Sequence, residues 1–172
     1  MNRTLMGLVA LLIGLCVCPS CGGKKYPDGF PKVYPLKVKV IQAGAPLADA
    51  SINFFAEDAT ISKWAVGGTT NAEGIAEIRT QNFPGCPAGK FKVVVKKTVQ
   101  EGGPQNAEEA KQMREGKEFP PVVVREMVSK EFGDHLKTPL SIEVTGSEGN
   151  TVPEFDVGDA YEEDISGTLL GS

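Results

Sequence analysis

The stretch Lys90-Phe-Lys-Val-Val-Val-Lys-Lys97 decides the fold class of this chain. Apolar and basic side chains alternate along most of it, so that Phe91, Val93 and Val95 share one face. Alternation with a period of two is typical of a β-strand that is buried on one face and solvated on the other. We therefore predict a strand over residues 90–97, with three lysines toward water: Lys90, Lys92 and Lys96.

Similar alternation recurs on both sides of this stretch. The other predicted strands cover residues 36–40, 50–54, 63–66, 75–80, 140–144 and 154–157. Turns separate them, and Gly44, Asn71 and Gly74 are the residues that favour two of these turns. About seven strands at such spacings predict an all-β fold, a seven-stranded β-sandwich over residues 36–158.

One segment departs from the β pattern. Residues 107–115 (AEEAKQMRE) are good helix formers, with acidic residues early and basic residues late. Asn106 can cap a helix there, Glu109 stands at the third position of a capping box, and Gly116 is placed to end it. The apolar stripe is narrow and consists of Ala107, Ala110 and Met113. Gly102, Gly103 and Gly116 flank this segment and are expected to add flexibility. We expect a short, mobile inserted helix on the rim of the sandwich, dispensable for folding.

Residues 1–20 predict an export signal. Arg3 provides a positive charge, and residues 5–17 then contain no charged side chain. A helix of that length spans about 20 Å, short of the ~30 Å hydrocarbon core, so it suits a signal peptide better than a membrane span. We predict that the signal ends before Cys21, that Cys21 is lipidated, and that residues 21–35, rich in Gly and Pro, form a flexible tether.

The choice of Cys21 leaves alternatives open. A lipobox has a branched aliphatic residue three positions before the modified cysteine and a small residue just before it. Cys21 follows Ser20 but has Cys18 at the aliphatic position, and Cys16 and Cys18 themselves match the pattern less well. Ordinary signal-peptidase cleavage nearby and an uncleaved anchor are the other readings. Cys86 is then the one thiol left in the body, which excludes a disulfide framework.

Composition excludes several function classes. Lys and Arg number 18 against 22 Asp and Glu, a net charge of −4, so there is no basic footprint for nucleic acid. The single histidine, His135, argues against a metal site built on two or three histidines. We expect no catalytic residue, no cofactor and no metal ion. Residues 159–172 are predicted to be a solvated acidic tail. The carboxylates in and near it lack the EF-hand pattern for calcium: Asp156, Asp159, Glu162, Glu163 and Asp164.

A series of motifs adds to this reading. In chain order they are Cys21-Gly-Gly, Tyr34-Pro-Leu-Lys-Val-Lys-Val40, Gly44-Ala-Pro-Leu-Ala-Asp-Ala-Ser-Ile-Asn-Phe54, Gly68-Thr-Thr-Asn-Ala-Glu-Gly-Ile-Ala-Glu-Ile78, Ala88-Gly-Lys-Phe-Lys-Val-Val-Val95, Lys130-Glu-Phe-Gly-Asp134 and Thr138-Pro-Leu-Ser-Ile-Glu-Val144. Together they resemble a family of bacterial lipoproteins with a carboxypeptidase regulatory-like, or transthyretin-like, domain. The resemblance covers residues 21–158 and implies a transthyretin-like sandwich. It implies no peptidase, because it is to the accessory sandwich and not to the zinc catalytic domain.

Three roles stay open on the sequence. The first is an exported, lipid-anchored, non-enzymatic protein of the cell envelope, bound to the membrane through its anchor and serving a structural or protein-interaction role. The second is a glycan-binding surface module, for which four aromatic side chains could form a platform: Trp64, Tyr26, Tyr34 and Tyr161. We nevertheless expect Trp64 to be a core residue. The third is an accessory domain of a separately encoded enzyme. Cys86 with His135 as its base lacks a nucleophile signature, so we expect His135 to be a solvated loop histidine and Cys86 to be a small buried thiol or an inert loop thiol.

Overall fold

A computed structural model describes residues 26–146 and 152–169 of the chain. The predicted signal peptide and Cys21 lie outside the described residues. The chain divides into two units, residues 1–30 and 31–172, and each is described by itself. In the first unit, Tyr26 and Phe30 stack with ring centroids 5.1 Å apart, and the Phe30 N–H donates to the carbonyl of Pro27 in a turn.

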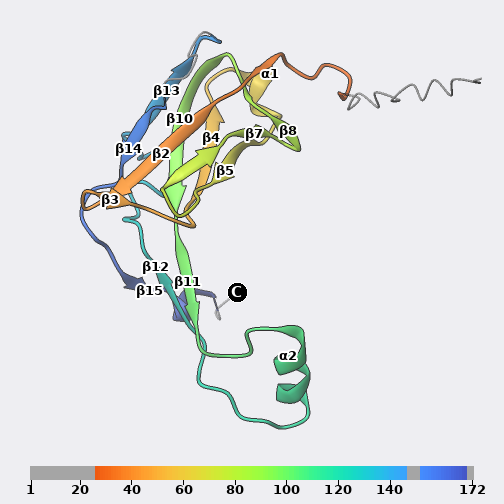
Figure 1. Cartoon of the computed structure of the whole chain (residues 1–172), viewed down its shortest axis with the longest axis vertical. Coiled ribbons are helices and arrows are strands. Elements are labelled where there is room, and N and C mark those ends of the chain that lie inside the picture. Colours follow the sequence, from red (N-terminus) through yellow and green to blue (C-terminus); the bar gives the residue numbers. More distant parts are fainter. Residues whose placement is uncertain (1–25, 147–151, 170–172) are drawn as a thin grey trace, which may run out of the picture. The chain divides into compact units, whose positions relative to one another are not determined.

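The second unit is an all-β fold (Figure 1). Its largest sheet has six strands in the order β13-β10-β4-β5-β7-β8, with neighbours antiparallel. Their bounds are β4 Ser51–Ala56, β5 Val66–Thr69, β7 Arg79–Thr80, β8 Phe83–Pro84, β10 Gly89–Lys96 and β13 Ser141–Val144. The predicted strands 50–54, 90–97 and 140–144 are thus confirmed as members of one sheet.

A second sheet is built around β2, into which the predicted strand 36–40 falls. Its members are β2 Lys37–Gln42, β3 Ala45–Pro46, β6 Ile75–Glu77 and β14 Glu154–Asp156. β14 runs parallel to β2, whereas β3 and β6 run antiparallel to it. Separately, β1 Val33–Tyr34 pairs with β9 Cys86–Pro87. Val33 and Tyr34, placed in the flexible tether by the sequence, therefore hydrogen-bond to the loop around Cys86.

Buried side chains from both sheets form one hydrophobic core. Phe91, Val93 and Val95 of β10 are at most 1% exposed, and Val38 and Val40 of β2 are fully buried. The face that the alternation assigns to the core is therefore confirmed in both strands. On the other face of β10 the lysines at its two ends are exposed, while Lys92 is half-buried and Val94 is buried.

A buried threonine fixes the segment that leads into β4. The Thr70 hydroxyl accepts a hydrogen bond from the Ala50 N–H at 2.8 Å and donates to the Leu47 carbonyl at 2.6 Å. Thr70 is 2% exposed, so both bonds lie away from solvent. This side chain therefore satisfies two buried backbone groups that lie outside the ladder of β4 and β5.

The number and length of the strands differ from the seven predicted. The described part of the chain contains many short strands in several sheets. The predicted strand 75–80 is split, because β6 pairs with β2 and β7 pairs with β5 of the other sheet. The expected strand 63–66 is wrong for its first three residues: helix α1 Ala59–Ser62 ends just before Lys63, and β5 begins only at Val66.

A further sheet of three strands and two helices lie beyond the end of β10 (Figure 1). The elements are β11 Thr98–Glu101, α2 Ala107–Arg114, β12 Val123–Glu126, β15 Glu163–Asp164 and α3 Ser166–Leu169. The strands are ordered β11-β12-β15 and are antiparallel. We call residues 98–126 the arm. Residues 163 and 164, which the sequence placed in a solvated tail, form a strand against it.

Candidate functional site: the arm

The inserted helix predicted at 107–115 is present as α2. The Asn106 side chain accepts the Glu109 N–H at 2.9 Å, as expected for the helix cap. The Glu109 carboxylate accepts the N–H of Gln105 at 2.7 Å, one residue earlier than a standard capping box would have it. Gly116 has a φ of +95° and follows the last turn, which agrees with its predicted role as terminator.

The helix α2 contributes no buried side chain to the core. Met113, the largest apolar residue of its narrow stripe, is 52% exposed. Apolar side chains at two other points of the arm are also accessible: Val122 is 44% exposed, and Phe119 is half-buried with the Lys117 Nζ 5.2 Å from its ring centroid. The arm therefore presents apolar side chains to solvent without using them for folding.

A tight glycine turn holds the two sides of the arm together. Gly102 and Gly103 have φ angles of +70° and +65°, and the Gly103 N–H donates to the Pro120 carbonyl at 2.9 Å. A Cβ on Gly102 would clash with the Pro121 carbonyl oxygen, and one on Gly103 would lie 2.6 Å from a methyl group of Val122. Close packing and positive φ angles explain why both positions are glycine. The turn therefore has one packed conformation, which differs from the flexibility expected of these glycines.

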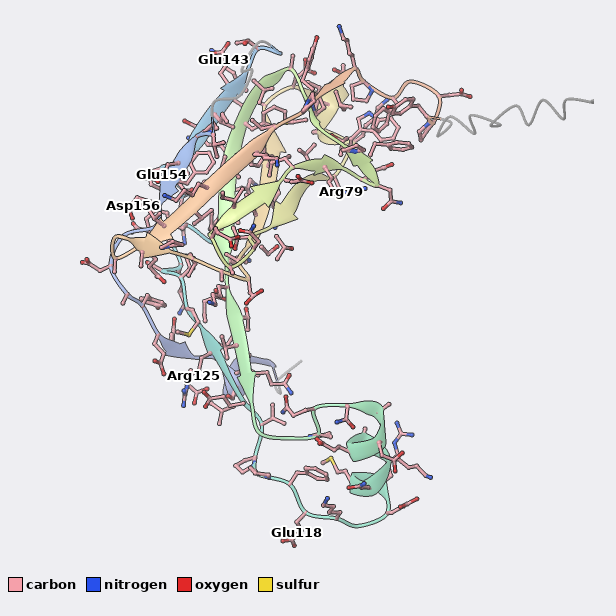
Figure 2. All side chains as sticks on the ribbon, viewed as in Figure 1. Arg79, Glu118, Arg125, Glu143, Glu154 and Asp156 are labelled. Carbon is pink, nitrogen blue, oxygen red and sulfur yellow. The ribbon has the colours of Figure 1, made fainter. Side chains whose placement is uncertain are left out.

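Charged side chains join the acidic C-terminal segment to strands β11 and β12, which we call the base of the arm. Arg125 of β12 forms ion pairs with Glu101 of β11 at 3.2 Å and with Glu162 at 3.1 Å. Figure 2 shows Arg125 on the sheet of the arm, well away from Glu118 at the far end. One guanidinium thus connects two adjacent segments of this sheet, in a geometry that favours arginine over lysine.

A second group of charges lies beside it. The Glu163 carboxylate accepts hydrogen bonds from the Lys130 Nζ and from the Tyr161 hydroxyl, both at 2.6 Å. The bond from Lys130, and then that from Tyr161, lower the pKa of Glu163. The same contact raises the pKa of Lys130, and the bond to Glu163 raises the pKa of Tyr161. Lys130 is exposed, and Tyr161 and Glu163 are half-buried, so solvent still screens these contacts and they orient the segment more than they stabilise it.

Backbone contacts complete this attachment. The Ser166 hydroxyl accepts the Val124 N–H at 2.8 Å, and the Ile165 N–H donates to the Val124 carbonyl at 2.8 Å. The Ser166 hydroxyl in turn donates to the Asp164 carboxylate, which lowers the pKa of Asp164. Three of the five C-terminal carboxylates, Glu162, Glu163 and Asp164, therefore help to hold this segment at the base of the arm, a role that neither their spacing nor their composition indicated.

The structure does not bring Cys86 and His135 together as a nucleophile and its base. Cys86 is fully buried in the core cluster. His135 lies on the solvent side of the six-stranded sheet, where its ring stacks on Phe55 at a centroid distance of 4.7 Å. Among residues 26–146 and 152–169, no group of three or more His, Cys, Asp or Glu side chains is placed to hold a metal ion.

The four aromatic residues named for a glycan platform belong to different segments of the chain. Trp64 is half-buried, and the Lys63 Nζ lies 5.4 Å from its ring centroid. Tyr161 hydrogen-bonds to Glu163 at the base of the arm, and Tyr34 belongs to β1. Tyr26 lies in the other unit of the chain. The prediction that Trp64 is a core residue is only partly met.

No helix among the described residues is long and apolar enough to cross a membrane. No protein-family model, curated protein or solved structure matches this chain.

Proposed function

We propose that this chain is an exported, lipid-anchored, non-enzymatic protein of the cell envelope that docks an envelope protein through its arm. The observation that carries the docking role is α2, which buries no side chain yet is capped at both ends and presents Met113 to solvent. A segment held in a defined conformation without contributing to the core is available for an interface, where exposed apolar side chains supply binding energy.

The finer fold assignment is part of this proposal. We infer that residues 36–158 are a transthyretin-like sandwich of the carboxypeptidase regulatory-like kind. The shared core of the two main sheets supports this assignment, as does the match between the motif order and strands β2, β4 and β10. The arm is then an insertion between β10 and β13, and it is the feature that distinguishes this chain from a minimal sandwich.

The anchor is tested by cell fractionation. Cys21→Ala should move the protein from the membrane fraction to the soluble exported fraction and abolish incorporation of labelled fatty acid. Cys18→Ala is the matched control and should change neither result. If Cys18→Ala releases the protein and Cys21→Ala does not, our choice of Cys21 as the lipidated residue is wrong. If neither variant is released from the membrane fraction, the proposal of a lipid anchor at these cysteines is wrong.

The docking role is tested by replacing residues 102–117 with a short Gly/Ser loop in the full-length protein. Proteins that copurify from detergent-solubilised envelopes should be compared between the wild type and this variant. We expect one stoichiometric partner to be lost, and to return when the wild-type protein is added back. The variant Lys37→Gln, a change on β2 far along the chain from the arm, should retain that partner. Equal recovery with and without the arm would contradict the proposal.

A further inference from the structure

The outer face of the six-stranded sheet carries a polar row outside the arm. Asn53 of β4 is in register with Gly67 of β5, and Gly67 is in register with Arg79 of β7. Gly67 has no side chain, so an open trough separates the amide of Asn53 from the guanidinium of Arg79. A Cβ on Gly67 would clash with the Ile52 carbonyl oxygen, so the packing of the strands maintains this gap.

The trough has a definite size and charge. It encloses about 280 Å³, and Ser51, Thr69 and Gln81 add hydroxyl and amide groups to its walls. No carboxylate is among the described residues that line it, although acidic residues outnumber basic ones in the chain. Arg79 is therefore the charged group of the trough, which makes it attractive to an anion. Figure 2 labels this side chain on the sheet.

Arg79 keeps most of its hydrogen-bonding capacity. One guanidinium nitrogen donates to the Asn82 carbonyl at 2.6 Å, which orients the group. Within the part of the chain that the structure describes, Arg79 forms no ion pair, in contrast to Arg125. A guanidinium has five N–H donors in a planar fork and binds a carboxylate with two parallel hydrogen bonds.

An aromatic hollow adjoins the trough. It encloses about 190 Å³, shares Asn53 with the trough, and is lined by Phe55 and Trp64. Phe55 is 43% exposed, and the Lys63 Nζ lies 5.4 Å from the Trp64 ring centroid. The combined surface is shallow. The hollow contributes aromatic rings, with Lys63 beside Trp64 and His135 stacked on Phe55, and the trough contributes neutral hydrogen-bonding groups with Arg79.

We propose that this trough binds a glycan that carries carboxylate groups. Arg79 binds a sugar carboxylate, Asn53 and the neighbouring hydroxyls bind ring hydroxyl groups, and the aromatic hollow contacts the apolar face of an adjacent sugar. A shallow surface rich in neutral donors suits an extended oligosaccharide better than a compact anion such as phosphate. The proposal is independent of the arm and of the lipid anchor.

Trp64 provides the readout, because it is the only tryptophan of the chain and lies beside the trough. The full-length protein in detergent is titrated with an oligogalacturonate and with a muramic acid-containing glycan strand while tryptophan fluorescence is recorded. We expect saturable binding of at least one of these probes. Methyl-esterified oligogalacturonate, which lacks the charge, should bind about tenfold more weakly, and so should oligoglutamate, which lacks the sugar.

Variants distinguish specific binding in the trough from nonspecific attraction of an anionic glycan to basic side chains. Arg79→Gln should weaken binding about tenfold or more, Asn53→Ala should weaken it less, and Arg79→Lys should restore part of the affinity. Arg114→Gln on α2 is the matched control and should bind as the wild type does. Absence of saturable binding by both carboxylated glycans would overturn the proposal. Equal binding by oligoglutamate, or by the Arg79→Gln variant, would also overturn it.

Discussion

Replacement of Thr70 by valine removes one hydroxyl from the interior and preserves the shape of the side chain. The hydroxyl satisfies the Ala50 N–H and the Leu47 carbonyl, and Thr70 is 2% exposed, so water cannot replace it readily. Leaving a buried backbone group without a partner costs about 1–3 kcal/mol. For two groups that relax together, we expect a loss of about 2–4 kcal/mol in the free energy of unfolding.

The measurement is urea unfolding of the full-length protein in detergent, followed by circular dichroism and Trp64 fluorescence. Thr69→Val is the matched control, because Thr69 is the exposed neighbour at the end of β5 and the same hydroxyl is exchanged. It should change the free energy of unfolding by less than about 0.5 kcal/mol. Equal effects of the two substitutions, with an unchanged urea slope, would refute the role assigned to the Thr70 hydroxyl.

Three further predictions concern the core, the arm and its base. Phe91→Ala should lower the free energy of unfolding by about 3–5 kcal/mol, because the ring is 1% exposed and packs on the ring of Phe54. In the same melts, Lys92→Ala on the other face of β10 should lower it by under about 1 kcal/mol, and equal losses would contradict the assignment of Phe91 to the core face. Replacement of residues 102–117 by a Gly/Ser loop should lower the melting temperature by only a few degrees, since α2 buries no side chain, and failure to fold would show that the arm completes the core. The pKa of Glu163 is lowered in the folded state, so the stabilisation from this carboxylate is present at neutral pH and is lost as the pH falls through the lowered pKa. Glu163→Gln should therefore reduce amide-exchange protection of β15 at pH 7, and the difference from the wild type should shrink as the carboxylate becomes protonated. Equal protection of the two proteins at pH 7 would contradict the assignment.

Strands can be predicted from the sequence where apolar and polar residues alternate within the strand itself. Residues of β2 and β10 alternate because one face of each is buried, and that requirement acts locally on every second residue. Strand β5 is the opposite case, since it contains Gly67 and Gly68, which have low strand propensity. Their selection comes from close neighbours in β4 and β6, the Ile52 and Glu77 carbonyl oxygens, which no local window contains.

The site was harder to predict because its parts come from distant segments. β11 follows β10 directly, but its partner β12 lies beyond the inserted helix. β15 consists of two acidic residues, Glu163 and Asp164, which by composition indicate a solvated tail. They form a strand because β12 offers a free edge beside Arg125, and this pairing over nearly forty residues leaves no periodic signal. The capped helix, in contrast, was predictable because Asn106 and Glu109 act within one turn.

The central claim, that the arm docks an envelope protein, is tested most directly by site-specific photo-crosslinking in intact cells. A photoreactive amino acid at Met113 of α2 should give one discrete adduct. The same group at Glu143 of β13, an exposed position on the six-stranded sheet, should give none. Co-expressed wild-type protein should diminish the Met113 adduct, and the variant lacking residues 102–117 should not. No adduct at Met113, or an adduct of the same size from both positions, would contradict the account.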